Sequence, residues 1–170
     1  MSRHPVMNKS IKCLVMDVDG TLTDGKIYMG ANGEMMKAFD IKDGYGIHDI
    51  LLPNGIIPII ITGRCSEIVE RRCKELGISE IHQGVKDKKN VLNSCCNRLG
   101  ATLQECAYIG DDLNDLHCMS LIQNNAGLIG CPADAVGQVK QIADFVSQYN
   151  GGCGAVREYI EWLIYKKSKI

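Results

Sequence analysis

Short apolar runs recur along the chain and alternate with amphipathic segments. The runs at 11–17 (IKCLVMD) and 56–62 (IIPIIIT) are almost continuously apolar, and each ends on a polar residue. Shorter apolar runs lie at 106–110 (CAYIG) and 126–130 (AGLIG), and brief strand-like segments with polar residues lie at 80–84 (EIHQG) and 143–147 (ADFVS). Continuous apolar runs of this length are typical of strands buried on both faces of a parallel sheet. We therefore predict a strand at each of these runs.

The segments between the runs predict helices. Ser66 is a suitable N-cap for a helix whose apolar residues recur at helical spacing and which ends at Gly77. Three more helices are predicted at 44–55, 86–99 and 156–165. The first of these is short, because the sequence Pro53-Asn54-Gly55 disfavours its continuation.

Residues 26–39 have the pattern of a β-hairpin rather than a helix. Asn32-Gly33 supplies a turn signal, and strand-forming residues flank it between Tyr28 and Met36. We predict that this hairpin forms a small flap on the domain.

Strands that alternate with helices at short spacing indicate βαβ units. We therefore predict an α/β fold, a Rossmann-like doubly wound parallel sheet, in a single domain over 1–170 with a C-terminal tail and helix at about 150–170. Only 25 residues, 63–87, separate Thr62 from Lys88, which leaves no room for an inserted cap domain.

Composition and charge exclude several classes of protein. The chain has 170 residues, of which 45% are hydrophobic, and a formal net charge of -1. These values describe a globular protein with no electrostatic preference for nucleic acid or anionic membranes. No apolar run reaches the ~20 residues of a membrane span, and the N-terminus lacks the apolar core of a signal peptide. The nine cysteines include no CxxC pair and, with the four histidines, lack zinc-site spacing, so we expect reduced core thiols in a cytoplasmic protein.

Polar motifs follow four of the predicted strands. They are DVDG at 17–20, TGR at 62–64, GVKDK at 84–88 and GDDLND at 110–115. In an open α/β sheet, ligands bind beyond the carboxyl ends of the strands. Asp and Asn also favour turns and helix caps, which is the alternative reading of DVDG or GDDLND taken alone. The order and placement of all four favour a functional site.

This ordered set resembles the motifs of the haloacid dehalogenase (HAD) superfamily of phosphatases over nearly the whole chain. The resemblance implies that Asp17 is the nucleophile that accepts the phosphoryl group. It implies that Asp19 protonates the leaving group and then activates water. Thr62 and Lys88 correspond to the second and third motifs, and Asp111 and Asp115 to the fourth.

The chemistry of these residue types agrees with such roles. A carboxylate that attacks a phosphate dianion needs a divalent metal and cationic donors to offset charge repulsion. Mg²⁺ prefers oxygen ligands, which Asp17, Asp111 and the backbone carbonyl of Asp19 can provide. Gly20 permits close approach of the backbone, whereas Asp112 is either a supporting residue or a helix cap.

Within the superfamily, the absence of a cap resembles a branch that acts on phosphates of 3-deoxy sugar acids. The stretches DGYGI (43–47), TGR (62–64) and GGCGAVRE (151–158) imply 3-deoxy-D-manno-octulosonate 8-phosphate (KDO 8-phosphate) as the substrate. Related enzymes for nonulosonate 9-phosphates tend to have an acidic residue where this chain has Arg64. A guanidinium pairs well with the carboxylate of a keto acid. The implied substrate-binding residues are Thr21, Asp43, Gly44, Gly63, Arg64 and Arg157.

The missing cap also bears on assembly. Because the aspartyl phosphate must be shielded from bulk water, we expect a homo-oligomer in which a neighbouring chain covers the site. The resemblance implies a tetramer, with Arg157 on a tail that reaches a neighbour's site.

Three other functions compete with this interpretation. One is the same chemistry on a nonulosonate 9-phosphate. Another is a phospho-accepting receiver module, which also uses Asp, Thr, Lys and Mg²⁺, but with an adjacent acidic pair on the first strand. The third is a catalytically idle sheet domain that acts only in assembly.

Overall fold

The computed structural model describes residues 10–168, so the predicted domain 1–170 extends beyond the described residues at both ends. Its centre is a six-stranded sheet in which every neighbouring pair is parallel, in the order β5-β4-β1-β6-β7-β8. The strands are β1 (Cys13–Met16), β4 (Ile57–Ile61), β5 (Glu80–His82), β6 (Cys106–Ile109), β7 (Leu128–Cys131) and β8 (Phe145–Val146). The α/β fold with a parallel sheet is confirmed, and each predicted run contains a strand.

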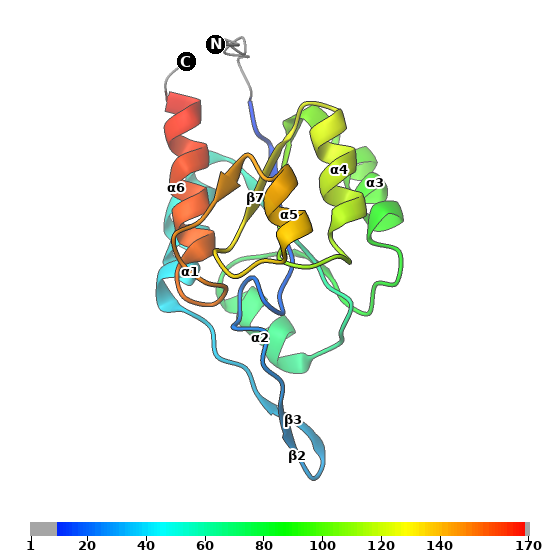
Figure 1. Cartoon of the computed structure of the whole chain (residues 1–170), viewed down its shortest axis with the longest axis vertical. Coiled ribbons are helices and arrows are strands. Elements are labelled where there is room, and N and C mark those ends of the chain that lie inside the picture. Colours follow the sequence, from blue (N-terminus) through cyan, green and yellow to red (C-terminus); the bar gives the residue numbers. More distant parts are fainter. Residues whose placement is uncertain (1–9, 169–170) are drawn as a thin grey trace.

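Helices cover both faces of the sheet, which gives three layers (Figure 1). They are α1 (Ile41–Tyr45), η1 (Gly46–Leu51), η2 (Leu52–Asn54), α2 (Glu67–Glu75), α3 (Lys88–Leu99), η3 (Leu103–Glu105), α4 (Leu116–Asn124), α5 (Gly137–Ile142) and α6 (Ala155–Ser168). Side chains of η1, α2 and α6 pack on one face, and those of α3, α4 and α5 pack on the other. In the part of the chain that is described, no helix is both long and apolar enough to cross a membrane.

The alternation of side chains along β1 explains its continuous apolar sequence. Leu14 and Met16 belong to the core on the α6 side, whereas Cys13 and Val15 belong to the core on the α3 side. Successive strand residues point to opposite faces, and both faces are covered here. The cysteines Cys13, Cys95, Cys96, Cys106, Cys118 and Cys131 are buried among these apolar side chains as free thiols, as expected.

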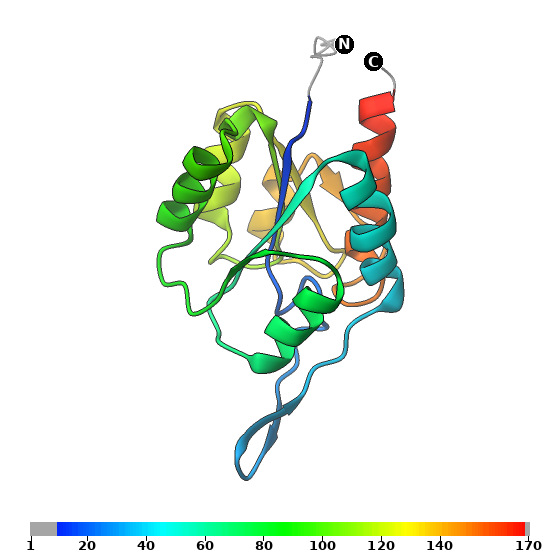
Figure 2. The same ribbon diagram turned by 180° about the vertical axis from the view of Figure 1, so that it is seen from behind.

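The predicted hairpin is present as β2 (Tyr28–Gly30) and β3 (Gly33–Met36), with Tyr28 opposite Met36. It projects from the carboxyl-end side of the sheet, as Figures 1 and 2 both show. Its turn is formed by Ala31 and Asn32, one residue earlier than the Asn32-Gly33 signal predicts. Gly33 uses its positive φ of 115° to begin β3 instead.

Most helix ends follow the predicted capping residues. The Ser66 hydroxyl accepts a hydrogen bond from the Val69 amide at the start of α2, and Gly100 ends α3 in the left-handed conformation. The segment predicted at 44–55 is longer than expected, because Asp40 caps it and it begins at Ile41. Pro53 lies within the final 3₁₀ turn instead of ending the helix, since the first turn does not need its amide.

Candidate active site

The carboxyl ends of β1, β4 and β6 meet at an open cavity of about 260 Å³. Its walls combine three of the predicted motifs with one residue outside them, Gly25. The lining residues are Asp17, Asp19, Gly25, Thr62, Gly63, Arg64, Asp111, Asp112 and Asn114. The register of the parallel strands therefore brings together residues from 17 to 114 of the chain.

Asp17 lies directly after β1, and its amide donates to the Ile109 carbonyl at 3.2 Å, which anchors it to β6. The residue is only 3% exposed. Its Oδ1 lies 3.1 Å from the Nζ of Lys88, the first residue of α3. This oxygen has no hydrogen-bond partner among the described residues beyond that ion pair. A buried carboxylate oxygen is thus available to a phosphorus atom or a cation.

Asp115 orients the surrounding groups and is completely buried. Its Oδ1 accepts from Lys88 Nζ at 2.8 Å and from the Tyr108 hydroxyl at 2.7 Å. Its Oδ2 accepts from the amides of Asp111 and Asp112 at 3.2 and 3.4 Å. These bonds fix Lys88 and the loop that carries Asp111.

Asp111 lies against the loop that follows Asp17. The Thr21 hydroxyl donates to its Oδ1 at 3.0 Å. Thr21, predicted to bind substrate, is thus buried beside Asp111 and does not line the cavity. Gly20 has a φ of 87°, and a Cβ there would lie 2.0 Å from Asp111 Oδ2. Glycine is therefore needed at this position for two reasons: a side chain would clash with the Asp111 carboxylate, and the positive φ disfavours other residues.

The crowded carboxylates fit a divalent cation. Oxygens of Asp17, Asp111 and Asp115 lie within 4.8 Å of one another. Burial, together with the charge of Asp115, raises the pKa of Asp17 to about 6, although Lys88 opposes the shift. Burial and the charges of Asp115 and Asp17 raise the pKa of Asp111 to about 7. Like charges that resist ionisation together are stabilised by a cation among them. Asp115 already accepts four hydrogen bonds, whereas Asp17 pairs with Lys88 and Asp111 accepts a side-chain bond from Thr21, so these two keep lone pairs for a cation.

The hairpin reaches into the site through Lys37, whose side chain is 1% exposed. Its ammonium lies 2.5 Å from Asp19 Oδ1 and 2.9 Å from Glu34 Oε1. Glu34 in turn accepts from the Ser66 hydroxyl at 2.5 Å and faces Arg64 NH2 at 3.6 Å. This network of hairpin charges ties the flap to Asp19 and to the start of α2.

Four of the predicted substrate-binding residues do not line this cavity, namely Thr21, Asp43, Gly44 and Arg157. The carboxylate of Asp43 accepts from the amides of Gly154 and Arg157 at 3.3 and 2.8 Å, and so caps α6. The Arg157 side chain pairs with Glu161 and lies over the Tyr45 ring, 5.0 Å from its centroid. In the single chain these contacts keep Asp43 and Arg157 away from this cavity.

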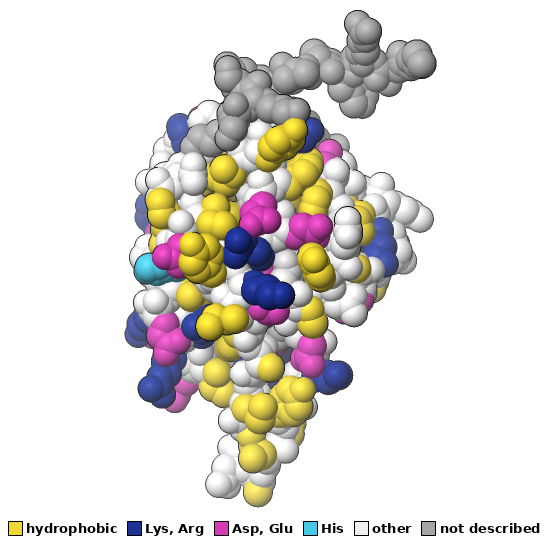
Figure 3. Space-filling model, turned by 90° about the vertical axis from the view of Figure 1, so that its left-hand side faces the viewer, with side chains coloured by type: hydrophobic (Ala, Val, Ile, Leu, Met, Phe, Trp, Pro, Cys, Tyr) yellow, Lys and Arg dark blue, Asp and Glu magenta, His cyan; other side chains and the backbone are white. Residues whose placement is uncertain are grey.

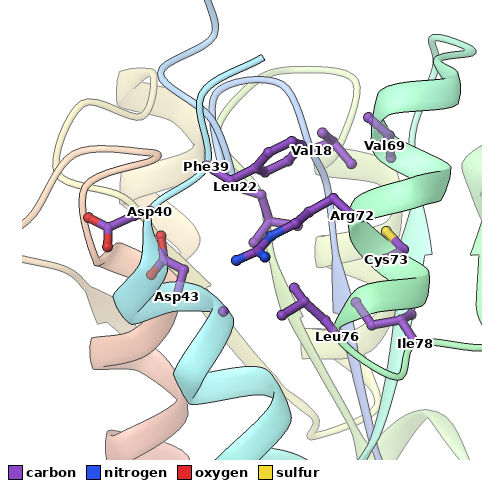
Figure 4. Close-up of a pocket in the computed structure, with 11 residues that line it drawn as sticks. Val18, Leu22, Phe39, Asp40, Asp43, Val69, Arg72, Cys73, Leu76 and Ile78 are labelled. Atoms are coloured by element: carbon purple, nitrogen blue, oxygen red, sulfur yellow. The ribbon is translucent and has the colours of Figure 1, made fainter. Parts of the chain in front are cut away.

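Gly44 and Asp43 instead line a small cavity of about 10 Å³ between α1 and α2 (Figure 4). There the Arg72 guanidinium points from α2 toward α1 among apolar side chains. A Cβ at Gly44 would lie 2.4 Å from Arg72 NH2. The glycine thus makes room for Arg72, which the sequence did not predict.

The GGCG segment, 151–154, packs on the loop that follows Asp19. The Gly152 amide donates to the Thr21 carbonyl at 3.0 Å. A Cβ at Gly151 would lie 1.9 Å from the Gly20 carbonyl oxygen. The segment is therefore a close backbone contact beside the active site, not merely an entry to α6.

Lys37, Glu34 and Tyr108 were not predicted from the sequence. Lys37 and Glu34 lie in the segment GEMMK, where polar residues on a hairpin read as solvated positions. Tyr108 lies inside an apolar strand, where an aromatic residue reads as core. A completely buried tyrosine hydroxyl needs a partner, and the buried Asp115, six positions after the end of β6, supplies it.

Comparison with known families agrees with this geometry. Residues 63–160 match the family model described as haloacid dehalogenase-like hydrolase. The chain belongs to the haloacid dehalogenase-like hydrolases. This membership, with the Asp17 and Asp111 arrangement, separates it from the receiver-type alternative.

Several of the similar proteins are named as phosphatases of the same substrate. A 3-deoxy-D-manno-octulosonate 8-phosphate phosphatase of Salmonella typhi is 42% identical over 172 residues, covering 100% of this chain and 88% of that protein. A structure of such a phosphatase from Moraxella catarrhalis, in complex with magnesium ion, phosphate ion and KDO, has a TM-score of 0.87 at 42% identity and covers 95% of this chain and 90% of that one. A cobalt-bound form from Haemophilus influenzae has a TM-score of 0.88 at 36% identity, covering 95% and 92%.

Proposed function

We propose that this protein is a Mg²⁺-dependent phosphatase that hydrolyses KDO 8-phosphate to KDO and phosphate through an aspartyl phosphate on Asp17. The observation that carries the proposal is the buried carboxylate of Asp17, 3.1 Å from Lys88 and within one cluster with Asp111. Relatives that are similar over nearly the full chain have this activity in their names.

The first step transfers the phosphoryl group to the protein. An oxygen of Asp17 attacks phosphorus while the bond from phosphorus to the C8 oxygen of the sugar breaks. The carboxyl group of Asp19 gives its proton to the departing alkoxide. Lys88 and Thr62 stabilise charge on the transferring oxygens, and Mg²⁺ held by Asp17 and Asp111 supplies further positive charge there when bound.

The second step releases phosphate. Asp19 is now a carboxylate, and it takes a proton from a water molecule whose oxygen attacks phosphorus. The bond between phosphorus and Asp17 breaks, and the Asp17 carboxylate is restored. Lys37 holds the Asp19 side chain at the cavity edge, where both proton transfers take place.

Arg64 is the residue best placed to select a sugar acid. It lines the cavity, its side chain is 44% exposed, and its guanidinium is held near Asp19 and Glu34 at 3.8 and 3.6 Å. A guanidinium in this position can pair with the carboxylate of an incoming keto acid. We assign Gly63 to the same wall of the substrate site.

We also propose that the protein forms a homotetramer through the hairpin. Four apolar side chains of the hairpin are exposed by 46 to 69%, namely Ile27, Met29, Met35 and Met36. Figure 3 shows hydrophobic side chains gathered on this projection. Such a surface is typical of an interface, and a neighbouring chain over the open cavity would exclude water from the aspartyl phosphate. The nine free cysteines support a reducing, cytoplasmic location.

A substrate panel tests the activity. Phosphate release is measured with Mg²⁺ on KDO 8-phosphate, nonulosonate 9-phosphates and simple sugar phosphates, with EDTA and Asp17→Asn as controls. We expect a clear preference for KDO 8-phosphate and no turnover in either control. A preference for the nine-carbon acid would show that the proposed substrate is wrong. Hydrolysis that persists in Asp17→Asn would reject the mechanism.

A further inference from the structure

A second cluster of metal-ligating side chains lies where the edge strand β5 packs on α3. Glu80 and His82 are two residues apart on β5 and project to the same side, and Cys95 meets them from α3. One ligand atom from each residue lies within 4.8 Å of the others. None of the three lines the catalytic cavity, and the proposed phosphatase chemistry uses none of them.

The separations match those around a tetrahedral ion. His82 Nε2 lies 3.2 Å from Glu80 Oε2 and 3.2 Å from Cys95 Sγ. Zinc bonds of about 2.0 to 2.3 Å place neighbouring tetrahedral ligand atoms about 3.3 to 3.7 Å apart. The three donors therefore need to move only slightly to share one ion.

Arg98 contacts two of the three side chains, Glu80 and Cys95, to whose Sγ its NH2 donates at 3.7 Å. Its NH1 donates to Glu80 Oε1 at 2.5 Å and its NH2 donates to Oε2 at 2.6 Å. Each carboxylate oxygen accepts in two directions, so Oε2 keeps one lone pair for a cation. Hydrogen bonds that orient a ligating carboxylate in this way are a regular feature of metal sites.

The types of ligand atom and their exposure to solvent indicate which class of ion the cluster would bind. The side chains of Glu80 and His82 are 14% and 29% exposed, so an ion can enter from solvent, whereas Cys95 is buried. One sulfur, one imidazole nitrogen and one carboxylate oxygen suit Zn²⁺ and similar transition metals, whereas Mg²⁺ prefers oxygen ligands alone.

We propose that Glu80, His82 and Cys95 form a transition-metal site, with water as the fourth ligand of a bound Zn²⁺. On binding, the Cys95 thiol releases its proton to solvent and its sulfur bonds to the ion. The ion joins β5 to α3 behind the catalytic residues. The His82 carbonyl accepts from the Thr62 amide at 3.0 Å, and α3 begins at Lys88. The bound ion would therefore stabilise the packing of β5 against α3. This structural role does not depend on the proposed substrate.

Co²⁺ is a suitable probe because sulfur-bound cobalt absorbs in the near ultraviolet, whereas cobalt bound only by oxygen in the catalytic site does not. The whole chain is saturated with Mg²⁺ and titrated with Co²⁺. We expect a sulfur-to-cobalt absorption that saturates at a single ion per chain and that Zn²⁺ abolishes. Cys95→Ser removes the absorption, and His82→Gln weakens Co²⁺ binding by about 10-fold to 100-fold.

Cys96→Ser is the matched control, because the neighbouring thiol faces Cys106 at 3.5 Å and takes no part in the cluster. It keeps the absorption. Circular dichroism checks the fold of each variant, and His82→Gln decides the matter if Cys95→Ser does not fold. The proposal is overturned if the wild-type chain shows no sulfur-to-cobalt absorption, if Cys95→Ser retains it, or if His82→Gln binds Co²⁺ as the wild type does.

Discussion

Lys37 of the hairpin lies 2.5 Å from Asp19 of the active site, and its side chain is almost completely buried. The flap is therefore joined to the proposed general acid and base by an ion pair. Lys26, at the start of the same hairpin segment, pairs with Asp24 at 3.4 Å but is 73% exposed. Comparing substitutions of Lys37 and Lys26 therefore distinguishes the effect of the contact with Asp19 from the effect of removing a positive charge from the hairpin.

Replacing Lys37 tests whether this ion pair positions Asp19. In Lys37→Met, Asp19 loses its partner and samples other orientations, so we expect kcat to fall by about 10-fold to 100-fold, a part of what general acid–base catalysis contributes. Steady-state phosphate release gives kcat and KM, and Lys26→Met serves as the control with unchanged kcat. Equal kcat values for Lys37→Met and the wild type would show that the pair has no catalytic role.

The raised pKa of Asp111 predicts a pH-dependent cost in stability. Its ordinary value is 3.8, and in the folded chain it is about 7. The folded chain without metal thus holds this proton more tightly than the unfolded chain, and it loses stability as pH rises between these two values.

Asp111→Asn removes that cost. Without metal, we expect its melting temperature to exceed that of the wild type by a few degrees at about pH 8, with the difference gone at about pH 4. Mg²⁺ raises the melting temperature of the wild type but not of the variant. Thermal melts with and without Mg²⁺ measure both effects, and a variant that Mg²⁺ stabilises as much as the wild type would contradict Asp111 as a ligand.

Gly20→Ala tests the close approach to the metal-binding carboxylate. Because the new Cβ would lie 2.0 Å from Asp111 Oδ2, the carboxylate must move. We expect Mg²⁺ affinity, measured by calorimetry, to weaken at least about 10-fold, as disturbed ligand support usually does. Gly137→Ala is the control, since its Cβ meets nothing within 4 Å. Unchanged affinity in Gly20→Ala would count against this geometry.

Arg64→Ala tests recognition of the sugar acid. Loss of a charged hydrogen bond to substrate costs about 1.5 to 3 kcal/mol, so kcat/KM for KDO 8-phosphate falls by about 10-fold to 100-fold. A simple phosphate ester without a carboxylate loses little. Arg71→Ala, an exposed position on α2, leaves both substrates unaffected. Equal losses on both esters would assign Arg64 to the phosphoryl group instead.

The sheet was predictable because both of its faces are covered, which makes most of its strands apolar runs; the edge strand β5, Glu80–His82, is the exception. Helices α4 and α5 were not assigned from the sequence. Asp115 begins α4 without a side-chain capping bond, since its carboxylate is used by Lys88 and Tyr108. Helix α5 has only six residues and also lacks a side-chain cap. Local signals were therefore weak at both helices.

Some residues of the site could likewise be predicted from the sequence, and others could not. Asp17, Asp19, Thr62 and Asp111 follow strands whose parallel register brings them together, so order along the chain was sufficient. The role of Asp43 depends on amides more than 100 residues later, at the start of α6. Likewise, the partner of Lys37 depends on how the hairpin folds back. Contacts of this kind follow from tertiary packing, which no local pattern encodes.

Chemical trapping of the covalent intermediate tests the central claim most directly. The protein is mixed with KDO 8-phosphate and Mg²⁺, quenched during a single turnover and treated with borohydride, which reduces an acyl phosphate to an alcohol. Peptide mass spectrometry then locates the change. We predict substrate-dependent conversion of Asp17 to homoserine, absent in Asp17→Asn. Reduction at a different carboxylate, or hydrolysis with no reduced residue, would contradict the account.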